Sequence, residues 1–462
     1  MTGHYFRTTA LGAIVRLATN NRFLALESYK DEYPKEASSG SSHSNLQLED
    51  DCILVGWKSH DDAENPHNWS TMRKTAVAAL ICLYTFTIYC GSSIYVPSVG
   101  QVMQEFSVTE TAASLGLALY VLGYGFGPLL FSPLSEIPYI GRNPIYIITF
   151  AIFNLLCVGA ALTESFAGFL IIRFLQGFFG SPCLATGAAS LTDMFSVIYV
   201  PYSLAAWSGA MYCGPALGPL LSGFSVVVKG WRWSMWELLW LSCFVFVLLV
   251  IFLPETSTPT LLYHRSKLLR EETGSDKYID ATSIALRVVT PRDAIKAALI
   301  KPFEISLKDP SIAFVNIYRF KALGSYDVPE TFLRPGLLGV FGAPIGMFLF
   351  GWGARESIPW EVPTLGIVIY CGFSFVVGSG IFIYLPLGYP HYAASLFATN
   401  DALRSSFAAA AILFGRPLYL NLGIGKGCSL LGGLSILGIV GFWYLFRYGD
   451  QLRKRSKFTI QQ

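Results

Sequence analysis

The sequence predicts an all-α membrane protein with about ten transmembrane helices, and three observations support this. Of the 462 residues, 53% are hydrophobic and only 14% are charged, whereas soluble domains carry about 25% charged residues. The mean hydropathy is +0.48, so the chain has too little polar surface for a soluble globule of this length. Apolar stretches of about 20 residues, long enough to cross a bilayer as a helix, recur along the chain.

These apolar stretches form two groups separated by a long polar segment. Six precede the middle of the chain, at 75–96, 111–132, 144–163, 167–189, 203–227 and 234–253. Four follow it, at 336–353, 362–385, 393–414 and 427–446. They are rich in Gly, Ala, Ser and Pro, which suits helices that pack closely in lipid. This layout is typical of a transporter built from two helical bundles.

Five segments are expected: an N-terminal tail, a six-helix bundle, a central loop, a four-helix remainder of a second bundle and a basic C-terminal tail. Their boundaries are 1–73, 74–253, 254–335, 336–446 and 447–462. The polar stretch 31–51 is expected to be disordered. The mildly amphipathic stretch 5–26 is either a helix on the membrane surface or a floppy tail.

Basic residues gather on one side of the predicted spans, and this bias sets the orientation. Arg73 and Lys74 precede the first span, and the central loop and C-terminal tail are rich in Lys and Arg. The links after spans one and three contain neither residue. Lys229 and Arg232 lie on the opposite side and weaken the pattern. Both termini of this multi-pass protein are therefore expected in the cytoplasm.

Several functional classes lack their characteristic residues. The nine cysteines include no CxxC pair and no histidine lies in the middle of a span, so we expect no metal site. No Walker motif occurs, and no Gly-x-Ser-x-Gly motif occurs in a polar context, so we expect neither an enzyme nor a bound cofactor. The net charge of +3 gives no basis for binding nucleic acid. The energy source would then be an ion gradient, most simply of protons.

A group of residues after span two has the form of a charge clamp. Gly127 and Glu136 lie toward the end of one helix, and a turn with Gly141 and Arg142 leads into the next. Asp193, after span four, is either a member of this clamp or a plain loop charge. We expect the clamp to act on conformation.

Charged residues inside spans are candidate functional residues, because burying charge in lipid is costly. Span four carries Arg173 and Gln176, followed by Gly177. Asp401 and Arg404 lie three residues apart in the span 393–414, so they share one helix face and can pair.

Three further motifs occur at defined points of the span map. Span five carries small residues and prolines that allow a kink and close helix contact, at Gly209, Gly214, Pro215, Gly218 and Pro219. Generic packing is the alternative explanation for these glycines. Just before span one stands Asp62-Ala-Glu64-Asn65-Pro66-His-Asn-Trp69, and span six ends with Leu253-Pro254-Glu255-Thr256.

Together these motifs resemble the major facilitator superfamily, and most of all the fungal drug:proton antiporters with twelve spans. The resemblance covers 62–318 and 328–458. It implies two facing six-helix bundles, with a substrate cavity lined by helices one, four, seven and ten. It also implies a monomeric efflux pump of the cell membrane that exports drugs, fungicides or secondary metabolites such as mycotoxins in exchange for protons. An importer such as a polyamine carrier, and a non-transporting degenerate member or sensor, stay open as alternatives.

The sequence departs from the family pattern in the middle of the chain. Family members have spans seven and eight between a stretch like 309–318 and one like 329–335, whereas only ten residues separate these stretches here. Two helices are therefore expected to be missing near 318–328, and the removal of a pair keeps the C-terminal tail on the cytoplasmic side. A skipped exon or faulty gene model is one explanation, and a true ten-span protein is the other. Asn143, in place of a second basic residue, is a smaller departure.

The resemblance also suggests roles for the intramembrane residues. It gives Arg173 and Gln176 a part in proton coupling, while an arginine that snorkels to the interface is the alternative. It implies that the clamp holds the outward-open state. Asp401 and Arg404 form either a gate or proton site, or a structural ion pair.

Tyrosines in the spans are candidates for lining an amphipathic substrate cavity. They are Tyr89, Tyr95, Tyr120, Tyr124 and Tyr212. For each of them, packing or a place at the membrane interface is the alternative.

Overall fold

The computed structural model describes residues 8–19, 53–59, 61–196, 198–280, 334–388 and 393–454. Within these ranges the chain is largely helical, with one two-stranded sheet. All ten predicted spans fall on helices, which confirms the predicted all-α fold. The predicted disorder at 31–51 and the predicted loss of two spans near 318–328 lie outside the described residues.

Eight helices make up the N-terminal half, and side-chain caps begin several of them. They are α3 (Thr71–Ser93), α4 (Val99–Phe106), α5 (Glu110–Ser135), α6 (Asn143–Leu162), α7 (Phe166–Gly180), α8 (Pro182–Met194), α9 (Val200–Lys229) and α10 (Arg232–Phe252). Short 3-10 turns, η1 (Pro66–Asn68) and η2 (Val96–Ser98), flank α3. The hydroxyls of Ser70, Thr109 and Ser165 accept backbone N–H bonds at the starts of α3, α5 and α7, which satisfies donors that a helix leaves open. Span four is divided at Ser181, where Pro182 begins α8.

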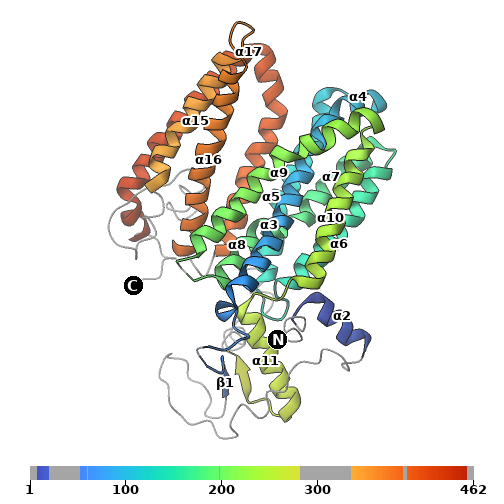
Figure 1. The fold of residues 1–462 in the computed structure, drawn as a ribbon, viewed down its shortest axis with the longest axis vertical. Helices are drawn as coiled ribbons and strands as arrows, with labels where there is room; N and C mark the ends of the chain where they lie inside the picture. Colours follow the sequence, from blue (N-terminus) through green and yellow to red (C-terminus); the bar gives the residue numbers. More distant parts are fainter. Residues whose placement is uncertain are drawn as a thin grey trace.

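The C-terminal half contains α15 (Arg334–Gly353), α16 (Glu361–Gly388) and α17 (Ala393–Lys454). The two last predicted spans lie on the single helix α17, which is interrupted at Gly423, where φ is 78° and ψ is 162°. Only glycine adopts such a backbone readily. Figure 1 shows the two limbs of α17 meeting at the top of the molecule.

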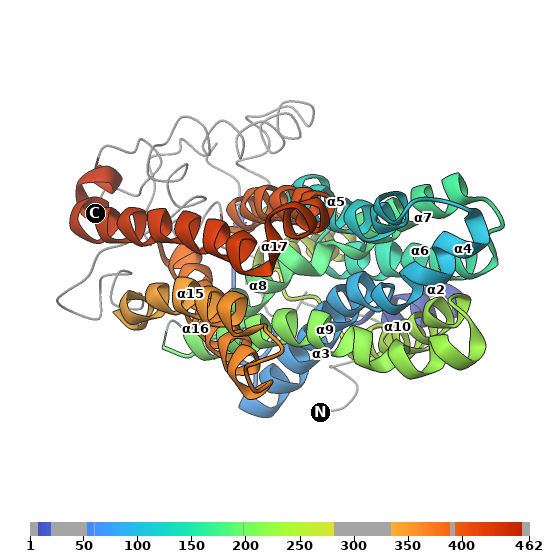
Figure 2. The ribbon, with the colours of Figure 1, turned by 90° about the horizontal axis from the view of Figure 1, so that it is seen from above.

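The two halves meet through a few helices near the middle of the molecule. Seen from above, α3–α10 lie on one side and α15–α17 on the other (Figure 2). The most extensive contacts between the halves are those of α17 with α5 and α8, and of α16 with α9. The spans of the N-terminal half are more buried, with 28–67% of their most apolar stretches buried, against 11% for α16 and 22% for α17.

A small polar module covers one end of the N-terminal half. Strand β1 (Ile53–Val55) pairs in parallel with β2 (Tyr278–Asp280), and α11 (Thr258–Thr273) packs against both. Arg265 of α11 is 2% exposed and pairs with Asp62 and Glu64, each at 3.0 Å. Burial raises the pKa of Asp62, but the backbone N–H groups of Glu64 and Lys58 and the charge of Arg265 bring it below its ordinary value. The motif before span one thus holds the tail against the central loop.

Candidate functional site

Arg173 lies inside the N-terminal half, on α7, with no exposed surface. Its guanidinium donates to the carbonyls of Gly116 and Gly91, each at 3.1 Å, and of Ser92 at 3.3 Å. It also donates to Oε1 of Gln176 at 3.2 Å. The side chain therefore joins α7 to α3 and α5 within the interior of this half.

Two of the predicted cavity tyrosines pack around this arginine. The guanidinium carbon of Arg173 lies 4.4 Å from the ring centre of Tyr120 and 5.3 Å from that of Tyr95. Their hydroxyls donate to the carbonyls of Ile88 and Ala113, at 2.8 Å and 2.9 Å. Both rings are fully buried, so the structure places them in the core of the N-terminal half.

Asp401 and Arg404 connect the two halves. Asp401 is 4% exposed, and its Oδ1 lies 2.5 Å from Nη2 of Arg404. The same nitrogen donates to the hydroxyl of Tyr89 on α3, at 2.6 Å. Tyr124 of α5 packs beside Tyr89 with the two rings tilted, their centres 5.3 Å apart. An ion pair of α17 is therefore bonded directly to the opposite half.

Other aromatic side chains continue this boundary on the α9 side. The hydroxyl of Tyr212 donates to the carbonyl of Ser374 on α16, at 3.2 Å. Trp207 packs edge-to-face on Phe382 and Phe397, with centres 5.4 Å and 6.3 Å apart. The boundary between the halves is thus an aromatic layer with a few polar groups, which suits amphipathic ligands.

The predicted clamp residues lie at the end of the bundle nearest the polar module, here called the clamp end. Nη1 of Arg142 lies 2.6 Å from Oδ2 of Asp193, so the structure brings span three and the end of span four together. Gly141 makes the turn with φ of 77°. Gly127 lies on α5 against Ser181, where a Cβ atom would come within 2.0 Å of the serine hydroxyl.

Glu136 ends α5 at the same clamp end and keeps exposed surface. Protein atoms crowd its carboxyl and raise its pKa to about 7, and the nearby charge of Asp193 adds to the rise while Arg142 opposes it. The carboxyl of Glu136 is thus close enough to the Arg142–Asp193 pair to interact with both charges.

Glu255, from the motif at the end of span six, anchors the clamp turn. Its Oε2 accepts the backbone N–H groups of Arg142 and Asn143, each at 3.0 Å. Its Oε1 accepts those of Thr256 and Ser257, each at 2.9 Å. Four N–H groups on one buried carboxylate fix the turn after span two against the end of span six.

Replacement of Glu255 by Gln should destabilise the protein by about 3 kcal/mol. Only one of the two side-chain oxygens remains to accept hydrogen bonds, so two of the four N–H groups lose their charged acceptor. Thermal unfolding in detergent measures the effect. Glu271→Gln is the control, since Glu271 is 61% exposed on α11. Equal melting temperatures for both variants would show that Glu255 does not anchor the turn.

Span five approaches span one closely at two of its predicted small residues. A Cβ on Gly218 would lie 2.1 Å from Oγ of Ser93, and one on Gly214 would lie 2.6 Å from Cβ of Tyr89. Gly209 has nothing within 4 Å of such an atom. Pro215 is exposed and Pro219 half-buried, and α9 remains one helix through both.

Gly218→Ala should therefore lower stability by about 1–3 kcal/mol, the usual cost of overpacking, because α9 must move away from the backbone of α3. Gly209→Ala is the matched control on the same helix and should be neutral or slightly stabilising. Melting temperatures of the two purified variants test this difference. If both variants melt alike, close packing is not the reason for the glycine at 218.

One acid within the apolar helices was missed by the sequence analysis. Glu237 lies on α10 and is close enough to Cys90 of α3 to act on its thiol electrostatically. Its Oε2 is buried and accepts no hydrogen bond from the described residues. The sequence shows Glu237 as the single acidic residue within the predicted span 234–253, which is the feature that could have identified it.

The end of the bundle opposite the clamp carries two ion pairs. Arg232 is one of the two basic residues on the side of the spans where few basic residues are expected. It lies 2.5 Å from Oε1 of Glu105, and the indole N–H of Trp231 donates to Oε2 of the same carboxylate. Arg416 of α17 lies 2.5 Å from Oε2 of Glu110 at the start of α5. This second pair joins the two halves, and the sequence offered no spacing that predicts it.

The comparisons with known proteins agree with this architecture. A sequence model described as Major Facilitator Superfamily matches residues 81–450. MFS-type transporter pyvG of Aspergillus violaceofuscus is 40% identical, over 88% of this chain and 85% of its own length. Fluconazole resistance protein 1 of Saccharomyces cerevisiae is 36% identical, over 92% of this chain and 88% of its own. The proton:xylose symporter XylE has a similar fold, with a TM-score of 0.59 at 15% identity, over 82% of this chain and 97% of XylE.

Proposed function

We propose that this chain, which belongs to the Major Facilitator Superfamily, exports small amphipathic organic compounds in exchange for protons. The chain is a multi-pass membrane transporter by family and by its apolar helices. Export is supported by relatives whose names refer to multidrug transport and to resistance to fluconazole and cycloheximide. The substrate class is supported by the aromatic boundary around Tyr89, Tyr124 and Tyr212.

The observation that carries the proposal is the ion pair between the buried Asp401 and the partly exposed Arg404, which reaches Tyr89 across the boundary. In this proposal, a proton on Asp401 removes the negative charge that holds Arg404. The bond from Arg404 to Tyr89 then loosens and the halves can move apart. Loss of the proton restores the pair. A carboxyl in an apolar site between two mobile bodies is suited to couple proton binding to their movement.

Placement in the cell membrane with both termini in the cytoplasm belongs to the same proposal. The basic tails and central loop support it. The pairing of β1 with β2 adds support, because it places the segment before span one and the segment after span six on the same side of the membrane. Six spans lie between these two segments. An even number of crossings returns the chain to the side of the membrane on which it began. We also propose that the transporter works as a monomer.

Asp401→Asn in proteoliposomes should lower transport of fluconazole driven by a pH gradient at least about tenfold, because an amide cannot bind and release the proton. Exchange of labelled for unlabelled compound without a gradient should continue. Glu356→Gln is the control, since Glu356 is exposed in the loop after α15, and it should leave both activities unchanged.

The outcomes of this experiment separate the alternatives. Loss of both activities in Asp401→Asn would mean that the ion pair is structural. If Asp401→Asn keeps full pH-driven transport and Glu237→Gln loses it, the proton site lies on α10. Lack of transport by the wild-type chain would favour a non-transporting member, and accumulation in cells that produce the protein would favour an importer.

The ten-span organisation of this chain is a further part of the proposal. We infer that two helices of the second bundle are missing near 318–328. The alignment with the Aspergillus relative spans 467 positions, whereas 88% of this chain is about 407 residues, so about 60 positions have no counterpart here. That number is close to two spans with their links. The low burial of α16 also fits a bundle that lacks neighbouring helices.

Sequencing of the native transcript across codons 310–335 should reveal an additional in-frame segment of about 60 codons, the number of aligned positions without a counterpart in this chain. Such a segment would show that the ten-span chain derives from exon skipping or a faulty gene model. A transcript that joins these codons directly would establish a true ten-span protein.

A further inference from the structure

Arg404 leaves part of its guanidinium open at the boundary between the halves. Its Nη2 donates to Oδ1 of Asp401 and to the hydroxyl of Tyr89. Its Nε and Nη1 make no hydrogen bond within the part of the chain that the structure describes. The side chain is 41% exposed. An arginine carries five N–H donors, so the donors on Nε and Nη1 remain for a ligand.

The open part of this guanidinium faces the space between the two halves. Its carbon lies 5.9 Å from the ring centre of Tyr89 on α3 and 6.0 Å from that of Phe382 on α16. Arg404 is also close enough to Tyr124 of α5 and Tyr212 of α9 to act on them electrostatically. Helices of both halves therefore flank a side chain that keeps accessible surface, so this surface lies between them.

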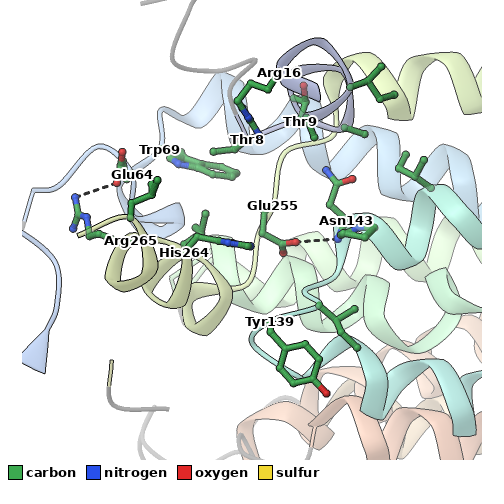
Figure 3. Close-up of a pocket in the computed structure, with 18 of the residues that line it drawn as sticks. Thr8, Thr9, Arg16, Glu64, Trp69, Tyr139, Asn143, Glu255, His264 and Arg265 are labelled. Carbon is green, nitrogen blue, oxygen red and sulfur yellow. Dashed lines mark hydrogen bonds and ion pairs between the residues drawn. The ribbon is translucent and has the colours of Figure 1, made fainter. Parts of the chain in front are cut away.

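Charged side chains at the clamp end are, by contrast, already engaged. A cavity of about 680 Å³ lies there beneath α2 (Ala10–Ala18), between this helix, the start of α6 and α11 (Figure 3). Arg265 on its wall is paired with two carboxylates, and the carboxylate of Glu255 accepts four N–H groups. The open donors of Arg404 are thus better placed to recognise a ligand than the charges of this cavity.

The charges around Arg404 favour a hydrogen-bond acceptor that carries no net charge. Asp401 supplies one negative charge against the one positive charge of Arg404, so the pair is neutral overall. The titratable side chains that face the pair from other helices are Tyr89, Tyr124, Tyr212 and Cys183. Tyrosine and cysteine are ordinarily uncharged at neutral pH. An organic cation would meet the positive side of the pair, and the nearest ring faces are already turned toward Arg404.

We propose that Arg404 donates to a hydrogen-bond acceptor of the transported compound, such as a carbonyl oxygen or a ring nitrogen. The site would then prefer uncharged amphipathic compounds to organic cations. This inference rests on the proposed function and narrows its substrate class.

The ion pair gives this recognition a fixed geometry. Asp401 and Tyr89 hold Nη2 of Arg404, so the remaining donors are positioned before a compound binds, which lowers the entropic cost of binding. A proton on Asp401 would release Arg404 from this position. The proton and the compound would therefore exclude one another, as an exchange of the two requires.

The test measures binding of two dansyl probes to the purified full chain in nanodiscs, without a pH gradient. Dansylcadaverine ends in an ammonium group, whereas its N-acetyl derivative ends in an uncharged amide whose carbonyl accepts hydrogen bonds. Fluorescence titration should show at least about tenfold tighter binding of the acetyl derivative, as expected for one hydrogen bond to a charged donor.

Arg404→Gln should abolish this preference, because it removes both the open donors and the positive charge that disfavours the ammonium probe. Arg355→Gln is the matched control, since Arg355 is exposed in the loop after α15, and it should keep the wild-type preference. Arg404→Lys guards against a folding defect. It keeps the positive charge beside Asp401 but lacks the planar group with several nitrogens, so it should also weaken binding of the acetyl probe about tenfold.

The outcomes separate this inference from the proposed function. Equal or tighter binding of dansylcadaverine by the wild type, no binding of either probe, or equal weakening of both probes in Arg404→Gln would each overturn the inference. Preference for the ammonium probe together with intact pH-driven transport of fluconazole would refute the substrate class alone. Preference for the acetyl probe without pH-driven transport would refute the proton coupling alone.

Discussion

The cost of placing charge in hydrocarbon is the constraint on which both halves of this protein depend. For Arg173 this cost is offset by backbone carbonyls and aromatic ring faces from α3 and α5. These partners cannot change without movement of three packed helices, and among the described residues no carboxylate contributes to them. Arg404 meets the same cost with Asp401 and a tyrosine of the other half. In the proposed coupling, one proton on Asp401 would be enough to change that arrangement, so the first arginine would fix a bundle while the second would respond.

The clamp end shows how the N-terminal half is made into one body. Glu255 fixes the turn before span three to the end of span six through backbone bonds, and Arg142 adds span four through Asp193. Beyond it, Arg265 ties the tail to the central loop. All of these contacts lie within the N-terminal half and the polar module that covers it. A rigid half that carries its own clamp can move as a unit against the other half, which is what rocking of two bundles requires.

The sequence predicted the spans and a possible Asp401–Arg404 pair, because both depend on local periodicity. It left open whether Asp193 joins Arg142 in the clamp or is a plain loop charge. It did not predict the bond from Arg404 to Tyr89, which joins residues more than 300 positions apart. It assigned Tyr95 and Tyr120 to a cavity, although only the tertiary position of Arg173 decides which way their rings face. The roles of these residues stay predictions. The amphipathic stretch 5–26 contains α2, but no periodicity could show that this helix closes a cavity.

The two halves differ in burial, and this difference bears on what a missing pair of spans would do. Apolar surface that faces lipid carries no hydrophobic penalty, and the backbone bonds of each helix are satisfied within it. The largely exposed α16 is therefore compatible with insertion into the membrane. The wall of a cavity between bundles has no such tolerance, because each absent helix leaves a gap that lipid or water fills. Loss of two spans would thus impair the enclosure of a substrate before it impairs folding of the N-terminal half, whose core, clamp and cavity under α2 are built from its own residues and the module that covers it.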